Sequence, residues 1–205
     1  MSDADLQSKL QQFDEFFSIE HQFNINIRPL EKHEAVSYDH FVANMPLPFK
    51  MAAEVMTVDQ GALRSIQSLS GVASQLVDYL NHQSHKLDML VGYILSQQDE
   101  PTNRFLGVRF GGGGVIFFSE QPFELQSLLE MKVFLLEENC AIYTAGEVVE
   151  TTEVEGGYHH KVVFKYIREE DQEVLVRHSL HQQSKQLQAL AQKRREKQEQ
   201  EQSSE

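Results

Sequence analysis

The chain has 205 residues, of which 40% are hydrophobic, and this apolar content is enough for a folded core. A formal net charge of −13 excludes sequence-independent binding to nucleic acid, which requires clustered Lys and Arg against phosphates. No apolar run approaches the roughly 20 residues of a membrane span. The acidic start of the chain shows no apolar secretion signal, so a cytoplasmic location is expected.

Residues 1–60 predict an N-terminal segment with one strand and short helices. Apolar and polar residues alternate from Phe23 to Arg28, which is the pattern of a half-buried strand. Residues 37–56 show a partly helical spacing that is interrupted at Pro46 and Pro48. Two short helical pieces are therefore expected after the strand.

The next segment, residues 61–98, carries a heptad repeat that predicts a long oligomerising helix. Such a repeat is the seam of a coiled coil, and a helix over residues 63–97 would be about 50 Å long. The alternative is a long helix that packs on its own sheet. Gln83 is a polar residue within the seam, of the kind that fixes register or the number of helices. The seam positions are Ile66, Leu69, Ala73, Leu76, Leu80, Gln83, Leu87, Leu90 and Ile94.

Residues 103–168 are rich in short strands separated by turn signals, which predicts a small antiparallel β-barrel. The glycines from Gly111 to Gly114 lie between two strand-like runs, so they predict a tight turn between strands. A phosphate-binding loop would require a helix after the glycines, and a strand follows here. The fold class is therefore α+β, with a barrel and long coiled-coil helices. The expected strands are 105–110, 115–118, 131–136, 142–150 and 159–166.

Residues 169–205 predict a C-terminal helix and a frayed polar tail. Leu180 and Leu187 continue a heptad-like spacing and join the predicted oligomer interface. Basic residues at 193–195 suit the end of a helix.

The order of these elements from Asn103 to Leu190 resembles a PilZ domain, the small β-barrel that in many bacteria is a receptor for cyclic di-GMP. The likeness begins at Gly114-Val115-Ile116-Phe117-Phe118-Ser119. It continues through Met131-Lys132-Val133-Phe134-Leu135, Ala145-Gly146-Glu147-Val148-Val149 and the helix after Asp171. The resemblance implies a non-enzymatic signalling protein.

The ligand motifs of that family are degenerate here. Members that bind cyclic di-GMP carry an Arg-x-x-x-Arg segment and an Asp-x-Ser-x-x-Gly turn. In this chain Arg109 stands at the Asp position, Gly111 at the Ser position and Gly114 at the final Gly. Arginine cannot accept the hydrogen bonds that a carboxylate accepts, and glycine has no hydroxyl group, so both polar contacts of the motif would be absent. No two arginines in the chain have the four-residue spacing of the Arg-x-x-x-Arg segment. The pair that comes nearest to it, Arg104 and Arg109, is five residues apart.

The resemblance also predicts where the first barrel strand lies. If residues 105–110 form the second strand, then Phe23 to Arg28 form the first, and the helices of residues 37–97 are inserted between the two. The region that would hold the arginine segment, near residues 16–22, contains no arginine.

No constellation in the sequence predicts catalysis or a metal centre. The pairs His82/His85 and His178/His181 have helical i, i+3 spacing, but no Cys or carboxylate completes a ligand set. His159 and His160 are adjacent on a strand and point to opposite faces. Cys140 has no basic neighbour in the sequence, so it is expected to be inert. No enzyme activity, resident cofactor or metal is expected.

These observations predict an oligomeric adaptor, a dimer or a tetramer, in cyclic di-GMP signalling that controls motility, pili or surface behaviour. Its signalling partner is an unidentified protein, and canonical cyclic di-GMP binding is not expected. The main alternative is a direct cyclic di-GMP receptor that uses Arg104 and Arg109 beside the glycines. A third is a purely structural coiled-coil module.

Overall fold

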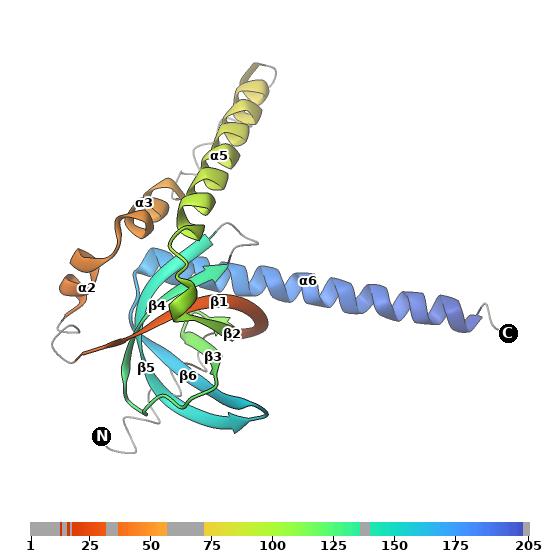
Figure 1. Ribbon diagram of the computed structural model, residues 1–205. Helices are drawn as coiled ribbons and strands as arrows, with labels where there is room; N and C mark the ends of the chain where they lie inside the picture. The colour runs from red at the N-terminus through yellow and green to blue at the C-terminus, as the bar shows by residue number, and fades with distance from the viewer. Residues whose placement is uncertain are drawn as a thin grey trace.

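A closed barrel of six antiparallel strands forms the centre of the protein (Figure 1). The computed structural model describes residues 13, 16, 18–31, 37–56, 72–135 and 140–202. Neighbouring strands follow the order β1-β2-β3-β6-β5-β4 around the barrel. The α+β fold with a small antiparallel barrel is confirmed. The strands are β1 (Ser18–Leu30), β2 (Arg104–Gly111), β3 (Gly114–Ser119), β4 (Leu128–Leu135), β5 (Cys140–Val154) and β6 (Gly157–Tyr166).

Strand β1 closes the barrel, as the sequence predicted for residues 23–28. Ile25 lies opposite Phe105 of β2 on one side and opposite Val133 of β4 on the other. The barrel therefore extends beyond the predicted range of 103–168. Because the end of β1 lies beside the start of β2, the helices between these strands leave and rejoin the barrel at the same end.

The glycine run forms the turn between β2 and β3. Gly111 at the end of β2 pairs with Gly114 at the start of β3. A Cβ atom on Gly114 would lie 2.1 Å from the carbonyl oxygen of Val162. Glycine is needed here because the backbone of β6 passes too close for any side chain.

The barrel interior is filled by the alternate, inward-facing residues of the strands. Ile25, Phe110, Phe117 and Leu129 are fully buried there. Leu175 of α6 (Glu169–Gln202) belongs to the same cluster. Helix α6 thus begins against the barrel core and then runs far beyond the barrel (Figure 1).

A second apolar cluster attaches three helices to the outside of β4 and β5. They are α2 (Tyr38–Asn44), α3 (Leu47–Met56) and α5 (Val72–Ser96). Phe41 of α2 stacks on Tyr143 with ring centroids 5.3 Å apart. Leu95 joins the cluster from the last turn of α5, and the rest of α5 rises away from the barrel (Figure 1).

A buried ion pair joins the start of α6 to α3. Arg168 donates hydrogen bonds to both carboxylate oxygens of Asp171, at 2.7 and 3.0 Å, and a third to the carbonyl oxygen of Phe49. Burial raises the pKa of Asp171, while the charge and hydrogen bonds of Arg168 act in the opposite direction.

Among the helices that the structure describes, none combines the length and apolarity that a membrane-spanning helix requires.

Candidate functional site

Arg109 and Gly114, two of the positions predicted for a degenerate ligand motif, lie beside the β2–β3 turn. Arg109 is opposite Glu20 of β1, and its Nη2 atom is 2.5 Å from Oε1 of that carboxylate. The arginine at the predicted motif position is therefore itself paired with a carboxylate. Gly111 adds only backbone at this place.

Arg109 lines a hollow of about 760 Å³ on the outer face of the barrel, which we call the barrel hollow. Its second cation, Lys161, has its Nζ atom 3.2 Å from Oε2 of Glu150. Any anion that entered the hollow would compete with a carboxylate at each of the two cations. The lining residues are Glu20, His21, Gln22, Val108, Arg109, Ile116, Glu150, Thr152, His159 and Lys161.

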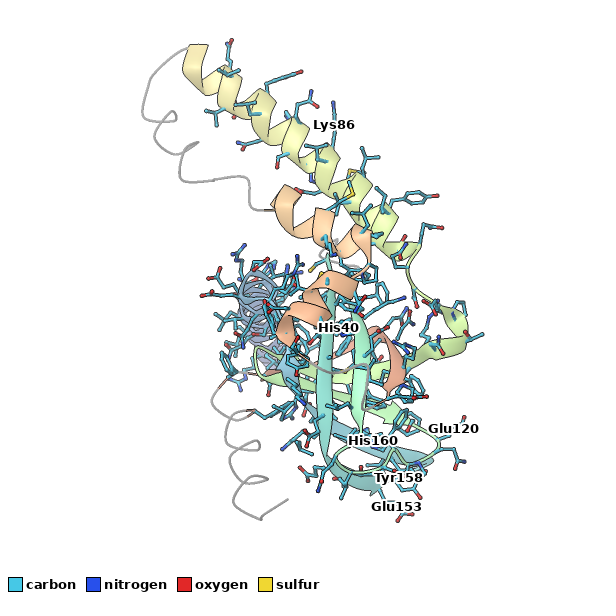
Figure 2. The ribbon with its side chains drawn as sticks, turned by 90° about the vertical axis from the view of Figure 1, so that its left-hand side faces the viewer. His40, Lys86, Glu120, Glu153, Tyr158 and His160 are labelled. Atoms are coloured by element: carbon cyan, nitrogen blue, oxygen red, sulfur yellow. The ribbon has the colours of Figure 1, made fainter. Side chains whose placement is uncertain are left out.

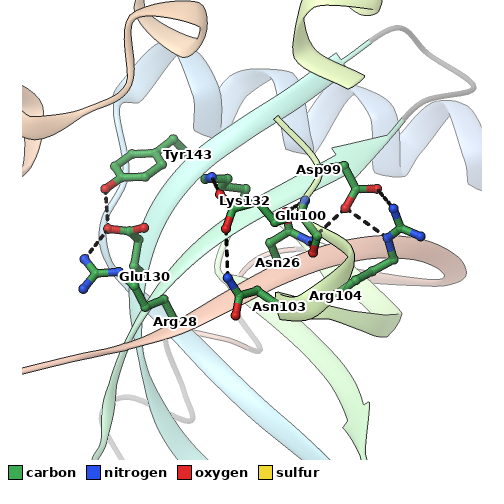
Figure 3. A network of polar contacts seen from close by, with 9 residues as sticks. All are labelled: Asn26, Arg28, Asp99, Glu100, Asn103, Arg104, Glu130, Lys132 and Tyr143. Carbon is green, nitrogen blue, oxygen red and sulfur yellow. Dashed lines mark hydrogen bonds and ion pairs between the residues drawn. The ribbon is translucent and has the colours of Figure 1, made fainter. Parts of the chain in front are cut away.

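Arg104, the other predicted nucleotide contact, does not line the barrel hollow. Its Nε and Nη2 atoms each lie 3.0 Å from a carboxylate oxygen of Asp99. Asn26 of β1 also donates a hydrogen bond to this carboxylate, at 2.8 Å (Figure 3). Asn24 of the same strand donates another, at 3.1 Å. Arg104 thus takes part in a polar junction between the end of α5 and β1.

Glu100 extends the same junction to β4. Its backbone N–H donates to the side-chain oxygen of Asn26 at 2.7 Å, and its carboxylate pairs with Lys132 (Figure 3). Hydrogen bonds from Lys132 and Asn103 lower the pKa of Glu100. The junction fixes the direction in which α5 leaves the barrel.

Helix α5 exposes one continuous apolar face, which we call the α5 exposed face. Leu76 is 51% exposed, Leu87 48% and Leu90 60%, which is high for side chains of this size. Gln83 is half-buried and lies on the same side of the helix. Ala73 lies in α5, while Ile66 and Leu69 fall outside the described residues. The face comprises Leu76, Tyr79, Leu80, Leu87, Leu90, Tyr93 and Ile94.

A different side of α5 contacts its own domain. Val77 and Leu95 are buried, and Val91 packs against the cluster that contains Phe49. At about 100° per residue, these positions lie roughly a quarter turn from the heptad seam. Packing within the chain therefore accounts for one apolar side of α5 and leaves the other exposed.

Helix α6 also carries exposed leucines. Leu180 and Leu187, both predicted interface residues, are half or more exposed, and so is Leu190. The first part of the helix is held by the barrel, since Gln172 donates to the carbonyl oxygen of Gly112 and Gln186 to that of Glu20, both at 2.8 Å. At about 100° per residue, Leu180 and Leu187 lie roughly 60–120° around the helix from these glutamines, whereas Leu190 lies on the same side as Gln172, about five turns further along.

The histidines form no metal centre within the described ranges, where no group of three or more His, Cys, Asp or Glu could hold an ion. His82 and His85 are exposed on α5 near Lys86, far from the barrel end that holds His160 (Figure 2).

His160 is fully buried between Ser119, at 2.9 Å from its Nε2, and Thr151, at 3.0 Å from its Nδ1. Burial lowers the pKa of His160. Ser119 already donates to the carbonyl oxygen of Gln121 at 2.5 Å, so this group is structural and not a nucleophile with its base.

Comparison with known proteins gives the following likenesses. The family model described as PilZ domain matches residues 81–181. The solved structure of the Bacillus subtilis inhibitor of motility (MotI/DgrA) is 19% identical, with a TM-score of 0.38, and the match covers 40% of this chain and 42% of that chain. No curated protein matches.

A Xanthomonas campestris structure, described as a new tetrameric PilZ domain self-assembled via a helical bundle, is 12% identical. Its TM-score is 0.52, and the match covers 87% of this chain and 96% of that one. This likeness in fold includes the helices as well as the barrel, because it spans most of both chains.

Proposed function

We propose, from the PilZ domain model that matches residues 81–181, that this chain is a non-enzymatic adaptor of bacterial cyclic di-GMP signalling that assembles into a homo-oligomer through its long helices. Its output would be motility, pili or surface behaviour, transmitted through a protein partner. The observation that carries the proposal is the α5 exposed face. A monomer would leave the seven large apolar side chains of this face in water, and Met89 of the same helix as well.

The width of this face favours a bundle with more than two helices. The four leucines of the α5 exposed face and Ile94 occupy a sector of about 80° around the helix axis. Tyr79 and Tyr93 widen this sector to about 140°. A two-stranded coiled coil needs a narrower stripe of only the a and d positions. The tetrameric helical bundle of the Xanthomonas protein supports the same arrangement.

The barrel hollow supports an adaptor role over nucleotide binding. Arg109 and Lys161, the two cations of its lining, are paired with Glu20 and Glu150. The carboxylate and hydroxyl of the family's ligand turn are missing. A signal would then reach the protein through contacts with other proteins.

The double variant Leu80→Ser/Leu87→Ser tests the assembly. Each buried leucine contributes about 1.5–3 kcal/mol to an interface, so the variant should dissociate while circular dichroism shows the barrel still folded. The matched control is Leu125→Ser, because Leu125 is 58% exposed but lies outside the helices. It should keep the mass of the parent in light scattering. A double variant with the parent's mass would contradict the proposal.

The alternative is a direct cyclic di-GMP receptor, which the size of the barrel hollow favours. A volume of about 760 Å³ is in the range of small-molecule sites. In that case a phosphate would replace Glu20 on Arg109. Titration with cyclic di-GMP separates the two functions, because only the receptor would bind it saturably.

A further inference from the structure

Two phenylalanines that precede β1 pack against the glycine turn from outside the barrel. Phe13 is only 3% exposed and clusters with Val149 and Val163, with Ile116 beside them. Phe16 is half-buried nearby. These contacts lie outside the barrel core, so barrel closure does not explain them.

The rings lie directly on glycine backbone. A Cβ atom on Gly114 would be 2.9 Å from Cδ2 of Phe13. One on Gly112 would be 2.7 Å from Cδ1 of Phe16 and 2.6 Å from Cγ2 of Val176, in α6. Any larger residue at these glycines would collide with the rings. The glycine run therefore forms a platform that two aromatic side chains occupy.

A cation completes the site around the first ring. Lys161 has its Nζ atom 5.0 Å from the ring centroid of Phe13, a cation–π geometry. The same lysine lines the barrel hollow, as does Ile116, so the ring site and the hollow share these two residues. The ring of Phe13 thus has a glycine floor, a valine wall and a lysine over one face.

We propose that this outer face of the barrel is a binding site for a peptide segment of the form Phe-x-x-Phe. In the structure its occupant is the chain's own Phe13 and Phe16, which form a displaceable strap. The strap is tethered, since β1 begins at Ser18, and a tethered segment competes with a free one at an effective concentration of about millimolar. A partner that presents two phenylalanines three residues apart would take the platform and release the strap.

Fluorescence anisotropy with a labelled peptide of residues 8–17 tests this site. The peptide is titrated into the full-length Phe13→Ala/Phe16→Ala variant, whose platform is empty, and into the parent. We expect saturable binding to the variant and binding at least about tenfold weaker to the parent, because the tethered strap competes. A control peptide with alanine at positions 13 and 16 should bind neither protein.

Lysine variants identify the site. In the double-variant background, Lys161→Ala should weaken peptide binding, because it removes the cation over the ring. Lys165→Ala is the matched control, since Lys165 lies over Tyr166 instead, and it should leave binding unchanged. No binding to the folded double variant would overturn the site. Equal binding to parent and variant would overturn the strap.

A second reporter covers the case in which the double variant does not fold. The chain contains no tryptophan, so Phe13→Trp introduces a single fluorophore at the platform. Its emission should be that of a buried ring and should shift to longer wavelength when the peptide is in excess. Emission that does not respond to the peptide would overturn the inference. Neither test depends on oligomerisation, which light scattering follows separately.

Discussion

The side-chain amide of Asn26 donates a hydrogen bond of 2.8 Å to the carboxylate of Asp99, and so joins β1 to the residues that follow α5. The backbone N–H of Glu100 returns a bond of 2.7 Å to the side-chain oxygen of Asn26. Asn26 is buried, and Arg104 donates to the same carboxylate. This reciprocal contact holds the direction of α5, and with it the position of the α5 exposed face relative to the barrel.

Replacing Asp99 with alanine should destabilise the protein. The donors Asn24, Asn26 and Arg104 would lose their shared acceptor, and a buried donor left unsatisfied costs about 1–3 kcal/mol. Urea denaturation should show a lower midpoint. Asn103→Ala is the control, because Asn103 donates to Glu100 in an exposed position, and it should change the free energy of unfolding by less than about 0.5 kcal/mol. Equal midpoints for Asp99→Ala and the parent would contradict the role of the junction.

Acidification should lower the free energy of unfolding through the buried side chain of His160. Burial lowers its folded-state pKa below 6.5, so on acidification the unfolded state takes up a proton that the folded state does not. Stability is therefore complete at neutral pH and is lost as the pH falls through 6.5 towards the folded-state pKa. His159 contributes in the same direction through its charge, while the hydrogen bond to the Gln121 backbone opposes it.

The measurement is the free energy of unfolding of the parent and of His160→Gln between pH 7.5 and pH 5. Glutamine can replace the hydrogen bonds to Ser119 and Thr151 but does not titrate. The advantage of the parent over the variant should shrink as the pH falls. A difference that stays constant across this range would contradict the account of His160.

The alternating residues of β1 show how far the sequence predicts the structure. Phe23, Ile25 and Ile27 face the core as their spacing indicated, and the glycines form the predicted turn. The same alternation places Asn26 on the outer face, where solvent is expected. Its burial depends on Asp99, 73 residues away, and no local pattern contains that contact.

The candidate site was predicted less completely than the fold, because its contacts also join residues that are far apart in the sequence. The heptad spacing indicated Leu80, Leu87 and Leu90, because a helix repeats locally. The pairing of Arg109 with Glu20 depends on strand register across 89 residues. The contacts of Phe13 with the glycine platform depend equally on the tertiary fold, although a short Phe-x-x-Phe spacing near a predicted strand is visible in the sequence.

The buried ion pair of Arg168 should prove sensitive to substitution. Arg168→Ala would leave the carboxylate of Asp171 buried without its partner and would free the carbonyl of Phe49, which should cost about 3–5 kcal/mol. Glu170→Ala is the control, because Glu170 is 46% exposed and 3.7 Å from the same arginine. Its effect in urea denaturation should stay below about 1 kcal/mol. Similar effects of the two variants would contradict the importance of the buried pair.

Isothermal titration with cyclic di-GMP distinguishes the adaptor from a receptor. We expect no saturable heat from the parent, because Glu20 and Glu150 occupy the cations of the barrel hollow. Glu20→Gln would release Arg109 and serves as the sensitised control. Saturable binding by the parent that disappears in Arg109→Ala would contradict the adaptor proposal and establish the receptor.

The mass of the purified parent protein in multi-angle light scattering tests the central claim most directly. The seven apolar side chains of the α5 exposed face predict an assembly, so the measured mass should be an integral multiple, at least two, of the 23.6 kDa chain at micromolar concentration. The width of that face favours four copies over two. A folded protein of 23.6 kDa at the same concentration would show that the face remains in solvent and would contradict the account.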